Sequence, residues 1–373
     1  MGGVAIERYV AIGDSQTEGL NDPDGRGGFR GWADRFADLL TLSNPHLQYA
    51  NLAIRGRTIA GIHDEQLRPA LDLRPDLATV MGGLNDLMRP SVDLDALAGR
   101  LDAMLASLRD AGTTVLTNTF PDPSTLAPLF RRLAPRVAAY NQRIHEVAAG
   151  RGALVVDFAA RGVGTDLRIW SPDRIHANPL GHSLIAAAFA DTLGLPGFQG
   201  WDDPLPTAAR RNAARRAGAE LRWLGGDVAP WMLRRVRGRS SGDGIPPKRP
   251  RLVPVASLFH LVEPAAWPRS GNYRPASLAA EGFVHLSFAD QVAGSANRHY
   301  ADAPELVVVE IDPMAVPAEI RVEDTYGSGT AFPHAYGPLP VSAAVATAPL
   351  RRDGNGQWLF SPDAADAAAS PDR

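Results

Sequence analysis

At 373 residues the sequence is long for one compact domain, so we expect two domains. A hydrophobic fraction of 45% and a charged fraction of 21% are ordinary for a folded protein with a core. The net charge of -3 argues against nucleic-acid or membrane binding by the whole chain. The sequence contains no cysteine, which excludes disulfides, thiolate zinc sites and a cysteine nucleophile.

The first two hundred residues alternate short apolar runs with helical patterns. We expect buried strands at 9–12, 47–51, 77–81, 114–116 and 153–156. Leucines at helical spacing predict a helix over 94–108 with Gly112 at its end, and a second helix over 137–147 is expected to end at Gly150. This alternation predicts a parallel sheet covered on both faces, whose functional site lies beyond the carboxyl ends of the strands.

Four short motifs occur in order along this region, each just beyond a predicted strand. They are Gly13-Asp14-Ser15, then Gly56, then Gly83-Leu84-Asn85-Asp86, then Asp173-Arg174-Ile175-His176. Any one of them alone is explained by a turn or a helix cap. Their joint occurrence indicates a site for acyl transfer through a serine.

The residue types fit that chemistry. The hydroxyl of Ser15 needs a base, and His176 is the candidate because an imidazole is the side chain best suited to accept a proton near neutral pH. Asp173 lies three residues before His176, so its carboxylate can reach the ring and fix its tautomer. The backbone N–H groups of Ser15 and Gly56 and the side-chain amide of Asn85 are three candidate donors to an oxyanion. Gly56 suits this place because glycine lets the backbone approach a ligand closely.

At these residues the chain resembles the SGNH, or GDSL-type, lipase and esterase family over about residues 5–235. The resemblance implies a flavodoxin-like three-layer α/β/α sandwich, with Ser15 as nucleophile and Asp173 and His176 completing the triad. It also implies that Gly56 and Asn85 complete the oxyanion hole. Gln16 departs from the family pattern, which has leucine there, and this leaves the local pocket open. The family spans esterases, thioesterases and carbohydrate deacetylases, so the resemblance implies a reaction class and not a substrate.

From about residue 208 to 251 the composition becomes strongly basic, with twelve arginines and lysines against three acidic residues. A helix is expected up to about Leu233, and the Ser-, Gly- and Pro-rich stretch at 240–247 is typical of an exposed linker. We therefore expect a hydrolase domain over 1–235, a linker over 236–252, an α+β accessory domain over 253–350 and a disordered tail over 351–373.

The accessory domain is expected to have strands at 253–262, 283–286, 305–311 and 341–346. Its motifs at 259–262, 282–287 and 332–339 resemble an uncharacterised bacterial domain family whose fold is thought to be related to the ADP-ribosyltransferase fold. Two interpretations stay open for its polar residues: a face that grips a ribose or phosphate, or buried histidines with internal partners. The residues concerned are His260, His285, Ser287, His334 and Tyr336.

The leading hypothesis is a serine hydrolase that cleaves an O-acyl ester or thioester of a small, carbohydrate or lipid substrate through an acyl-serine intermediate. One alternative is that the C-terminal domain processes NAD or a 2′-phosphorylated RNA end. Another is a polyanion-binding chain with a vestigial hydrolase site, which the lack of interleaved aromatic residues disfavours.

Neither a cofactor nor a metal is expected, because no cluster has metal-ligand spacing. The expected partner is a small-molecule ester, and the pattern sets no oligomeric state. No apolar run approaches the roughly 18 residues of a membrane span. Glu7 and Arg8 interrupt the stretch in which a signal peptide needs apolar residues, so we expect a cytoplasmic protein.

Overall fold

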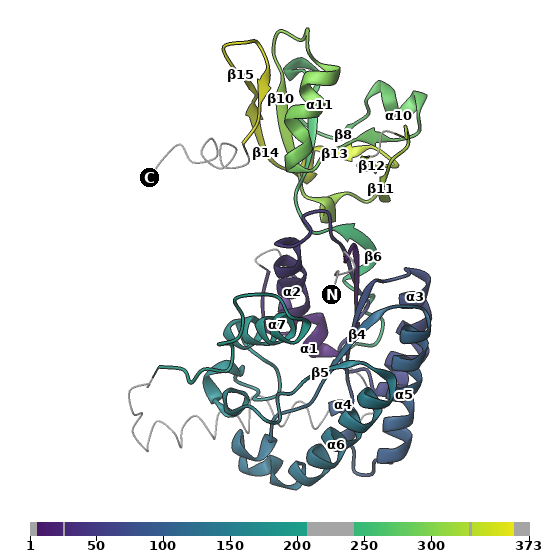
Figure 1. Ribbon diagram of the computed structural model, residues 1–373, viewed down its shortest axis with the longest axis vertical. Helices are drawn as coiled ribbons and strands as arrows, with labels where there is room; N and C mark the ends of the chain where they lie inside the picture. Colours follow the sequence, from purple (N-terminus) through teal and green to yellow (C-terminus); the bar gives the residue numbers. More distant parts are fainter. Residues whose placement is uncertain (1–5, 25–26, 207–241, 328–329, 362–373) are drawn as a thin grey trace. The chain divides into compact units, whose positions relative to one another are not determined.

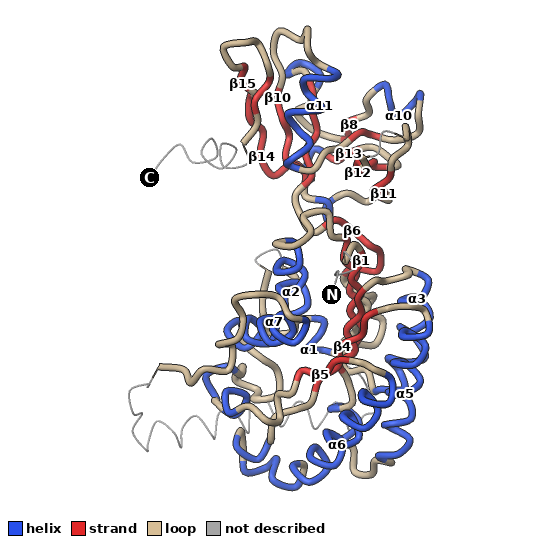
Figure 2. Tube along the Cα trace, viewed as in Figure 1, coloured by secondary structure: helices blue, strands red, loops and turns tan. Residues whose placement is uncertain are grey.

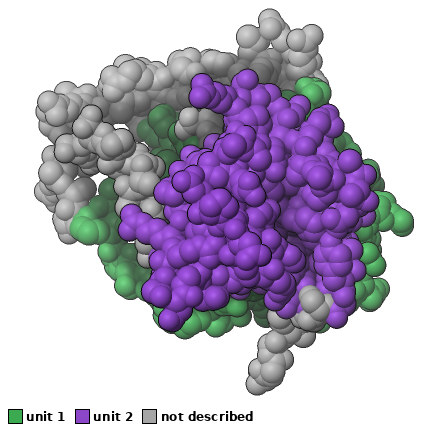
Figure 3. All heavy atoms as spheres, turned by 90° about the horizontal axis from the view of Figure 1, so that it is seen from above, with its two compact units in different colours: residues 1–44, 48–252 green, residues 45–47, 253–373 purple. Residues whose placement is uncertain are grey.

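A computed structural model of the chain describes residues 6–24, 27–206, 242–327 and 330–361 (Figure 1). The chain divides into two compact units. Unit 1 holds residues 1–44 and 48–252, and unit 2 holds residues 45–47 and 253–373 (Figure 3). The predicted arginine-rich helix and the basic residues up to Arg239 lie outside the described residues. Across the described ranges, no helix combines the length and the apolar character that crossing a bilayer requires.

The sheet of unit 1 has the strand order β5-β4-β3-β1-β2-β6. Neighbours among the first five strands run parallel, and Gly13 at the end of β1 lies opposite Met81 at the end of β3. The five strands predicted from the sequence are all present, which confirms the parallel α/β prediction. Their bounds are β1 Arg8–Gly13, β2 Gln48–Asn51, β3 Leu77–Met81, β4 Thr114–Asn118 and β5 Leu154–Val156.

Helices cover both faces of this sheet and make three layers (Figure 2). One face carries α3 Ile59–Asp72, α5 Leu94–Asp110 and α6 Ala134–Arg151. The other carries α2 Gly31–Thr41 and α7 Pro179–Leu193. Two short helices follow β1 and β3 directly, α1 Ser15–Glu18 and α4 Leu84–Leu87. The connections after β4 and β5 contain the 3₁₀ turns Pro123–Thr125, Pro128–Arg132, Gly162–Thr165 and Leu167–Ile169.

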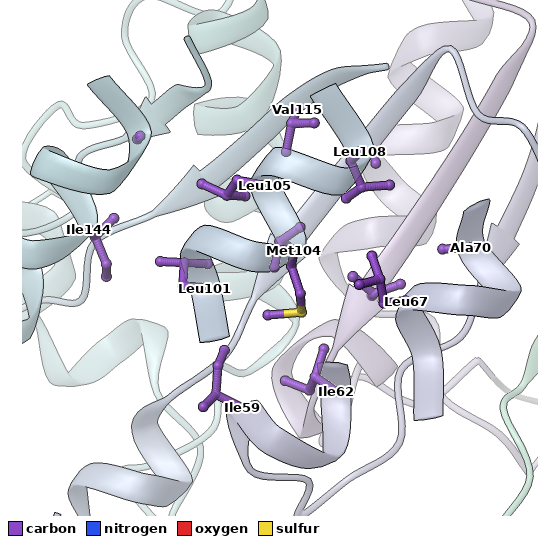
Figure 4. Close-up of a cluster of buried hydrophobic side chains, with 14 of the residues drawn as sticks. Ile59, Ile62, Leu67, Ala70, Leu101, Met104, Leu105, Leu108, Val115 and Ile144 are labelled. Atoms are coloured by element: carbon purple, nitrogen blue, oxygen red, sulfur yellow. The ribbon is translucent and has the colours of Figure 1, made fainter. Parts of the chain in front are cut away.

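Alternation along β1 sends its side chains into two separate cores. Val10 and Ile12 belong to the apolar cluster between the sheet and α3, α5 and α6, and Figure 4 shows the part around Met104 and Leu105. Tyr9 points to the other face, where its ring centroid lies 5.3 Å from that of Phe36 on α2. Full burial of one such apolar side chain stabilises the fold by about 1.5–3 kcal/mol. Because β1 packs into a core on each face, its end, which carries the site, is held in place.

The helix predicted from the leucine spacing is α5. The side chain of Asp93 caps it by accepting the N–H groups of Asp95 and Ala96, both at 3.0 Å. The end predicted for α6 at Gly150 is wrong by two residues. Gly150 stays helical, and the helix stops at Gly152, whose φ of 63° is the left-handed conformation that glycine adopts without strain.

Part of the segment predicted as a linker is a strand. β6, Arg249–Pro254, joins the sheet of unit 1 beside β2. Just before it, the Nζ atom of Lys248 lies 3.0 Å from Asp34 Oδ1 and donates to the carbonyl of Phe29 at 2.9 Å. The strand predicted over 253–262 is therefore two strands, because a bend at Val255 and Ala256 separates β6 from β7, Leu258–Val262. Residues 236–241 of the predicted linker lie outside the described residues.

Unit 2 is a small α+β unit, as predicted, and the strand pairs described in it run antiparallel. One sheet has the order β14-β10-β7 and another the order β11-β12-β9, and β8 pairs with β13. The strands are β8 Asn272–Tyr273, β9 Val284–His285, β10 Val307–Ile311, β11 Ile320–Glu323, β12 Phe332–Ala335, β13 Leu339–Pro340 and β14 Ala344–Pro349. The helices are α10 Ala276–Ala280 and α11 Val292–His299. The strand expected over 341–346 starts only at Ala344, because Val341–Ala343 forms a 3₁₀ turn.

The tail predicted to be disordered over 351–373 begins with a hairpin, β15 Arg351–Arg352 and β16 Trp358–Leu359. Trp358 is only 3% exposed, and its indole N–H donates to the carbonyl of Tyr300 at 2.8 Å. Burial of this large ring offsets the entropic cost of ordering the chain, so the first part of the segment is folded and the prediction of disorder is wrong there. Residues 362–373 lie outside the described residues.

Candidate active site

The turn after β1 holds Ser15 at the first position of α1. The side chain of Gln66 brackets this turn, because it accepts the N–H of Gly13 at 2.8 Å and donates to its carbonyl at 2.9 Å. A Cβ at position 13 would lie 2.6 Å from the carbonyl oxygen of Met81, so only glycine fits there. Asp14 caps α1 by accepting the N–H of Gln16 at 3.2 Å. Ser15 is thereby held at the carboxyl edge of the sheet.

Three predicted residues meet there although 161 residues separate Ser15 from His176. The Oγ atom of Ser15 lies 2.8 Å from Nε2 of His176, and Nδ1 of the same ring lies 2.7 Å from Oδ2 of Asp173. A carboxylate accepts the Nδ1–H, which leaves Nε2 to accept the serine proton. The arrangement can therefore transfer a proton from Ser15 to His176.

Asp173 is held in its ionised form. Burial alone would raise its pKa, but hydrogen bonding and attraction from His176, with two backbone N–H groups, keep the pKa below its ordinary value. Those N–H groups belong to Ile175 and His176 and donate to Oδ1, both at 3.0 Å. Asn21, which the sequence interpretation missed, donates from Nδ2 to Oδ2 at 3.1 Å. Asn21 has a φ of 69°, a left-handed value that asparagine tolerates better than most residues.

Gln16, noted in the sequence as a departure from the family pattern, ties α1 to the bend that contains His176. Its Nε2 donates to the carbonyl of Ile175 at 3.4 Å, and its Oε1 accepts the N–H of Ala177 at 3.1 Å. These two residues flank His176 on either side. The departure from the family pattern was the sequence signal that pointed to this position.

The predicted oxyanion donors line the same cavity as Ser15 and His176. Gly56 has a φ of 74°, which strains any residue with a side chain. Asn85 lies in the first turn of α4, and its Nδ2 donates to Asp14 Oδ2 at 3.2 Å and to the carbonyl of Arg57 at 3.0 Å. The amide of Asn85 is thus held at the cavity wall from two sides.

Asp14 is a carboxyl group that the sequence interpretation treated only as part of a turn. It is 4% exposed, and burial raises its pKa to about 6, with Asp86 adding repulsion and His176 opposing it. Its position directly before the nucleophile was the signal that could have marked it. Because this carboxyl group accepts a hydrogen bond from the amide of Asn85, its protonation changes the hydrogen bonding of that amide.

Next to Ser15 lies a cavity of about 420 Å³ whose wall is mostly apolar. Its size is typical of a small-molecule site. Among the described residues, no group of three or more histidines, aspartates or glutamates has a geometry that could hold a metal ion.

In unit 2 several predicted residues gather in one aromatic cluster. The ring of His334 stacks on Phe283 with centroids 4.1 Å apart and lies 5.3 Å from that of His285. His334 Nδ1 lies 3.3 Å from Glu323 Oε1, which also accepts the hydroxyl of Tyr336 at 2.6 Å. His334 and Tyr336 therefore have internal partners.

The remaining predicted residues of unit 2 also have internal partners, and Nε2 of His285 lies 3.3 Å from Glu281 Oε1. Nδ1 of His260 lies 2.9 Å from the carbonyl oxygen of His285, whereas its Nε2 has no partner among the described residues. Burial lowers the pKa of His260 to about 4, so the ring is neutral at pH 7. The hydroxyl of Ser287 donates to that of Ser295 at 3.3 Å. Neither a ribose nor a phosphate grip follows from these contacts.

Comparison with known proteins matches residues 11–184 to the GDSL-like Lipase/Acylhydrolase family. Residues 11–184 are thus similar to a GDSL-like hydrolase domain. An acetylxylan esterase of Geobacillus stearothermophilus is 26% identical over 212 residues, which cover 50% of this chain and 94% of that protein. The chain is an enzyme that acts on esters, as predicted from its motifs. Among solved structures, LAE5, an alpha/beta hydrolase from the metagenome of Lake Arreo, is 23% identical with a TM-score of 0.44, covering 51% of this chain and 96% of its own.

Residues 260–347 match a second family, described as Protein of unknown function (DUF952). The crystal structure of protein CC0527 from Caulobacter crescentus is 26% identical, with a TM-score of 0.27, and covers 31% of this chain and 100% of its own. The family match at residues 260–347 bears out the uncharacterised family predicted for this part. Its relation to the ADP-ribosyltransferase fold stays a prediction.

Proposed function

We propose that the hydrolase domain cleaves O-acyl esters through a covalent acyl-serine intermediate formed on Ser15. The observation that carries the proposal is the 2.8 Å distance between Ser15 Oγ and His176 Nε2, with Asp173 behind the ring at 2.7 Å. A complete relay of this kind favours an active enzyme over a vestigial site. The similarity to an acetylxylan esterase supports an O-acyl ester as the bond that is cleaved.

In the first half of the reaction, Ser15 Oγ attacks the carbonyl carbon as its proton passes to His176 Nε2. The carbonyl oxygen becomes an oxyanion, which the N–H groups of Ser15 and Gly56 stabilise. The amide of Asn85 joins them when one of its two N–H groups turns from Asp14 or Arg57 to the substrate oxygen. The bond to the leaving alkoxide then breaks, and His176 returns the proton to it. An alcohol departs and the acyl group stays on Ser15.

In the second half, water takes the place of the alcohol. His176 accepts a proton from water as the hydroxide attacks the acyl carbon, and the same oxyanion donors act again. The bond to Ser15 breaks, the proton returns to its Oγ, and the carboxylic acid leaves. Asp173, ionised throughout, stabilises the imidazolium at both stages.

The test is hydrolysis of p-nitrophenyl acetate by the full chain and by Ser15→Ala. We expect kcat to fall at least about ten-thousand-fold, as when a triad member is removed elsewhere. Ser107→Ala is the matched control, because the Ser107 hydroxyl donates to the carbonyl of Ala103 within α5 and does not line the cavity beside Ser15. Equal rates for Ser15→Ala and Ser107→Ala, with both variants folded by circular dichroism, would reject the proposal.

A further inference from the structure

We infer that the cavity beside Ser15 binds an unbranched apolar chain of the ester, so that the enzyme prefers substrates with a medium-length chain to simple acetate esters. This inference rests on the proposed function of Ser15. It names the substrate class of the same site: esters with an apolar chain, in contrast to hydroxyl-rich carbohydrate esters.

The first observation is the character of the wall. Many of the side chains that line the cavity and keep contact with solvent are apolar, and Leu129 is 54% exposed. Exposing such apolar surface to water is unfavourable in free energy, and covering it with an apolar group of the substrate is favourable. The residues of this kind are Leu84, Met88, Trp170, Leu184 and Ile185.

A second observation concerns three buried aromatic side chains in the cavity wall. Phe120, Phe158 and Trp201 also line it, and each is only 8% exposed. Phe158 packs edge-on against Trp201 with ring centroids 5.6 Å apart, which holds both rings in place. An acetyl group would leave most of a 420 Å³ cavity filled with water, whereas a longer chain would displace that water from rigid apolar walls.

The third observation is that the polar side chains in the wall outside the relay already have partners in the protein. Arg55 pairs with Glu18, Arg174 donates to the carbonyl of Leu126, and the Thr119 hydroxyl donates to Asp157. The Oδ1 atom of Asn118 has no partner among the described residues, but it is closed off from solvent. Sugar hydroxyls entering this cavity would lose water and gain few hydrogen bonds in return.

Chain-length dependence tests the inference directly. We would measure kcat/KM of the full chain for p-nitrophenyl acetate, butyrate and octanoate, which share one leaving group. Each buried methylene is worth roughly a fourfold gain in kcat/KM, so butyrate, with two more methylenes, should exceed acetate about sixteenfold, and octanoate should exceed butyrate. A rate that is highest for acetate, or an acetylated xylo-oligosaccharide that outperforms octanoate, would overturn the inference.

Two isomeric esters locate the chain within the site. Ethyl octanoate carries the eight-carbon chain on the acyl side and octyl acetate carries it on the alcohol side. Preference for either one over ethyl acetate supports an apolar-chain cavity and assigns its side. Ethyl acetate as the best of the three would contradict it.

A substitution assigns the preference to this cavity. Leu184→Asn replaces an apolar wall group on α7 by an amide of similar shape, and we expect the octanoate-to-acetate ratio of kcat/KM to fall about tenfold. Leu180→Asn makes the same change one turn earlier on α7 at an exposed position outside the cavity wall, so its ratio should match the unsubstituted chain. A ratio unchanged by Leu184→Asn, with melting temperatures equal for the two variants, would overturn the assignment.

The two proposals fail in different ways. Hydrolysis that survives in Ser15→Ala would reject the serine mechanism. Hydrolysis that is lost in Ser15→Ala, together with acetate as the best substrate, would keep the mechanism and reject the apolar-chain cavity.

Discussion

Replacing Asp14 by asparagine should alter the pH dependence of stability by an amount that follows from its burial. The carboxyl group is 4% exposed, and burial raises its pKa from 3.8 to about 6. A shift of this size corresponds to about 3 kcal/mol of unfavourable free energy when the folded protein holds the group ionised. Between these two pKa values the folded state binds a proton that the unfolded state has released, so the free energy of unfolding falls as pH rises.

Most of this change lies in an accessible range. Integrated from pH 4.5 to pH 8, the Asp14 contribution to the free energy of unfolding falls by about 2 kcal/mol. Asp14→Asn cannot ionise, so it should gain about 2 kcal/mol relative to the unsubstituted chain over the same range. An asparagine amide also presents a donor to Asn85 Nδ2 or to the N–H of Gln16, which both need acceptors. That mismatch costs the same at both pH values and cancels in the comparison.

The assay is urea unfolding of both proteins at pH 4.5 and pH 8, monitored by tryptophan fluorescence. We expect the gain in stability to come with a loss of function, because the mismatch disturbs the amide of Asn85. Loss of one oxyanion donor typically lowers kcat about a hundred- to a thousand-fold. A stability difference between the two proteins that stays constant within 0.5 kcal/mol, on the order of the scatter in such measurements, would refute a buried titrating carboxyl at this position.

Three further outcomes are expected. Gln16→Leu removes both hydrogen bonds to the residues beside His176, so kcat should fall about tenfold with little change in KM. Gln16→Glu should not restore kcat, and an unchanged kcat in Gln16→Leu would count against a positioning role. Asn85→Ala should lower kcat about a hundred-fold or more with normal folding, and a change in KM alone would argue against an oxyanion role. Burial lowers the pKa of His182 to about 4, so the unfolded state binds a proton that the folded state lacks as pH falls below 6.5. The free energy of unfolding should therefore drop by up to about 3 kcal/mol by pH 4. His182→Gln should flatten that drop in urea titrations.

Local patterns predicted the hydrolase fold well, because its strands are buried and continuous. The run at 77–81 became β3 with the expected bounds, and the leucine spacing placed α5 correctly. Helix ends were harder, since Gly150 and Gly152 are equally suitable in sequence and only the last turn of α6 decides between them. β6 was missed because its residues, Arg249–Pro254, are basic and proline-containing, and pairing with β2 at a sheet edge compensates for that composition.

For the site, spacing and order predicted which residues meet, but not what surrounds them. The contact between Asp173 and His176 follows from their separation of three residues, whereas the bond from Asn21 to Asp173 joins distant segments. Gln16 was noted only as a departure from a pattern, and its two hydrogen bonds depend on how α1 lies against residues 175–177. Contacts of this kind come from tertiary packing, which a single sequence does not encode locally.

The central claim is that one hydroxyl, that of Ser15, is made nucleophilic by His176. Mass spectrometry after reaction with a fluorophosphonate, a reagent that forms a covalent adduct with activated serines, tests it most directly. The account predicts one adduct per chain, on the peptide containing Ser15, absent in Ser15→Ala and formed at least about a hundred-fold more slowly in His176→Ala. An adduct on another residue, or labelling of Ser15 at the same rate without His176, would contradict it.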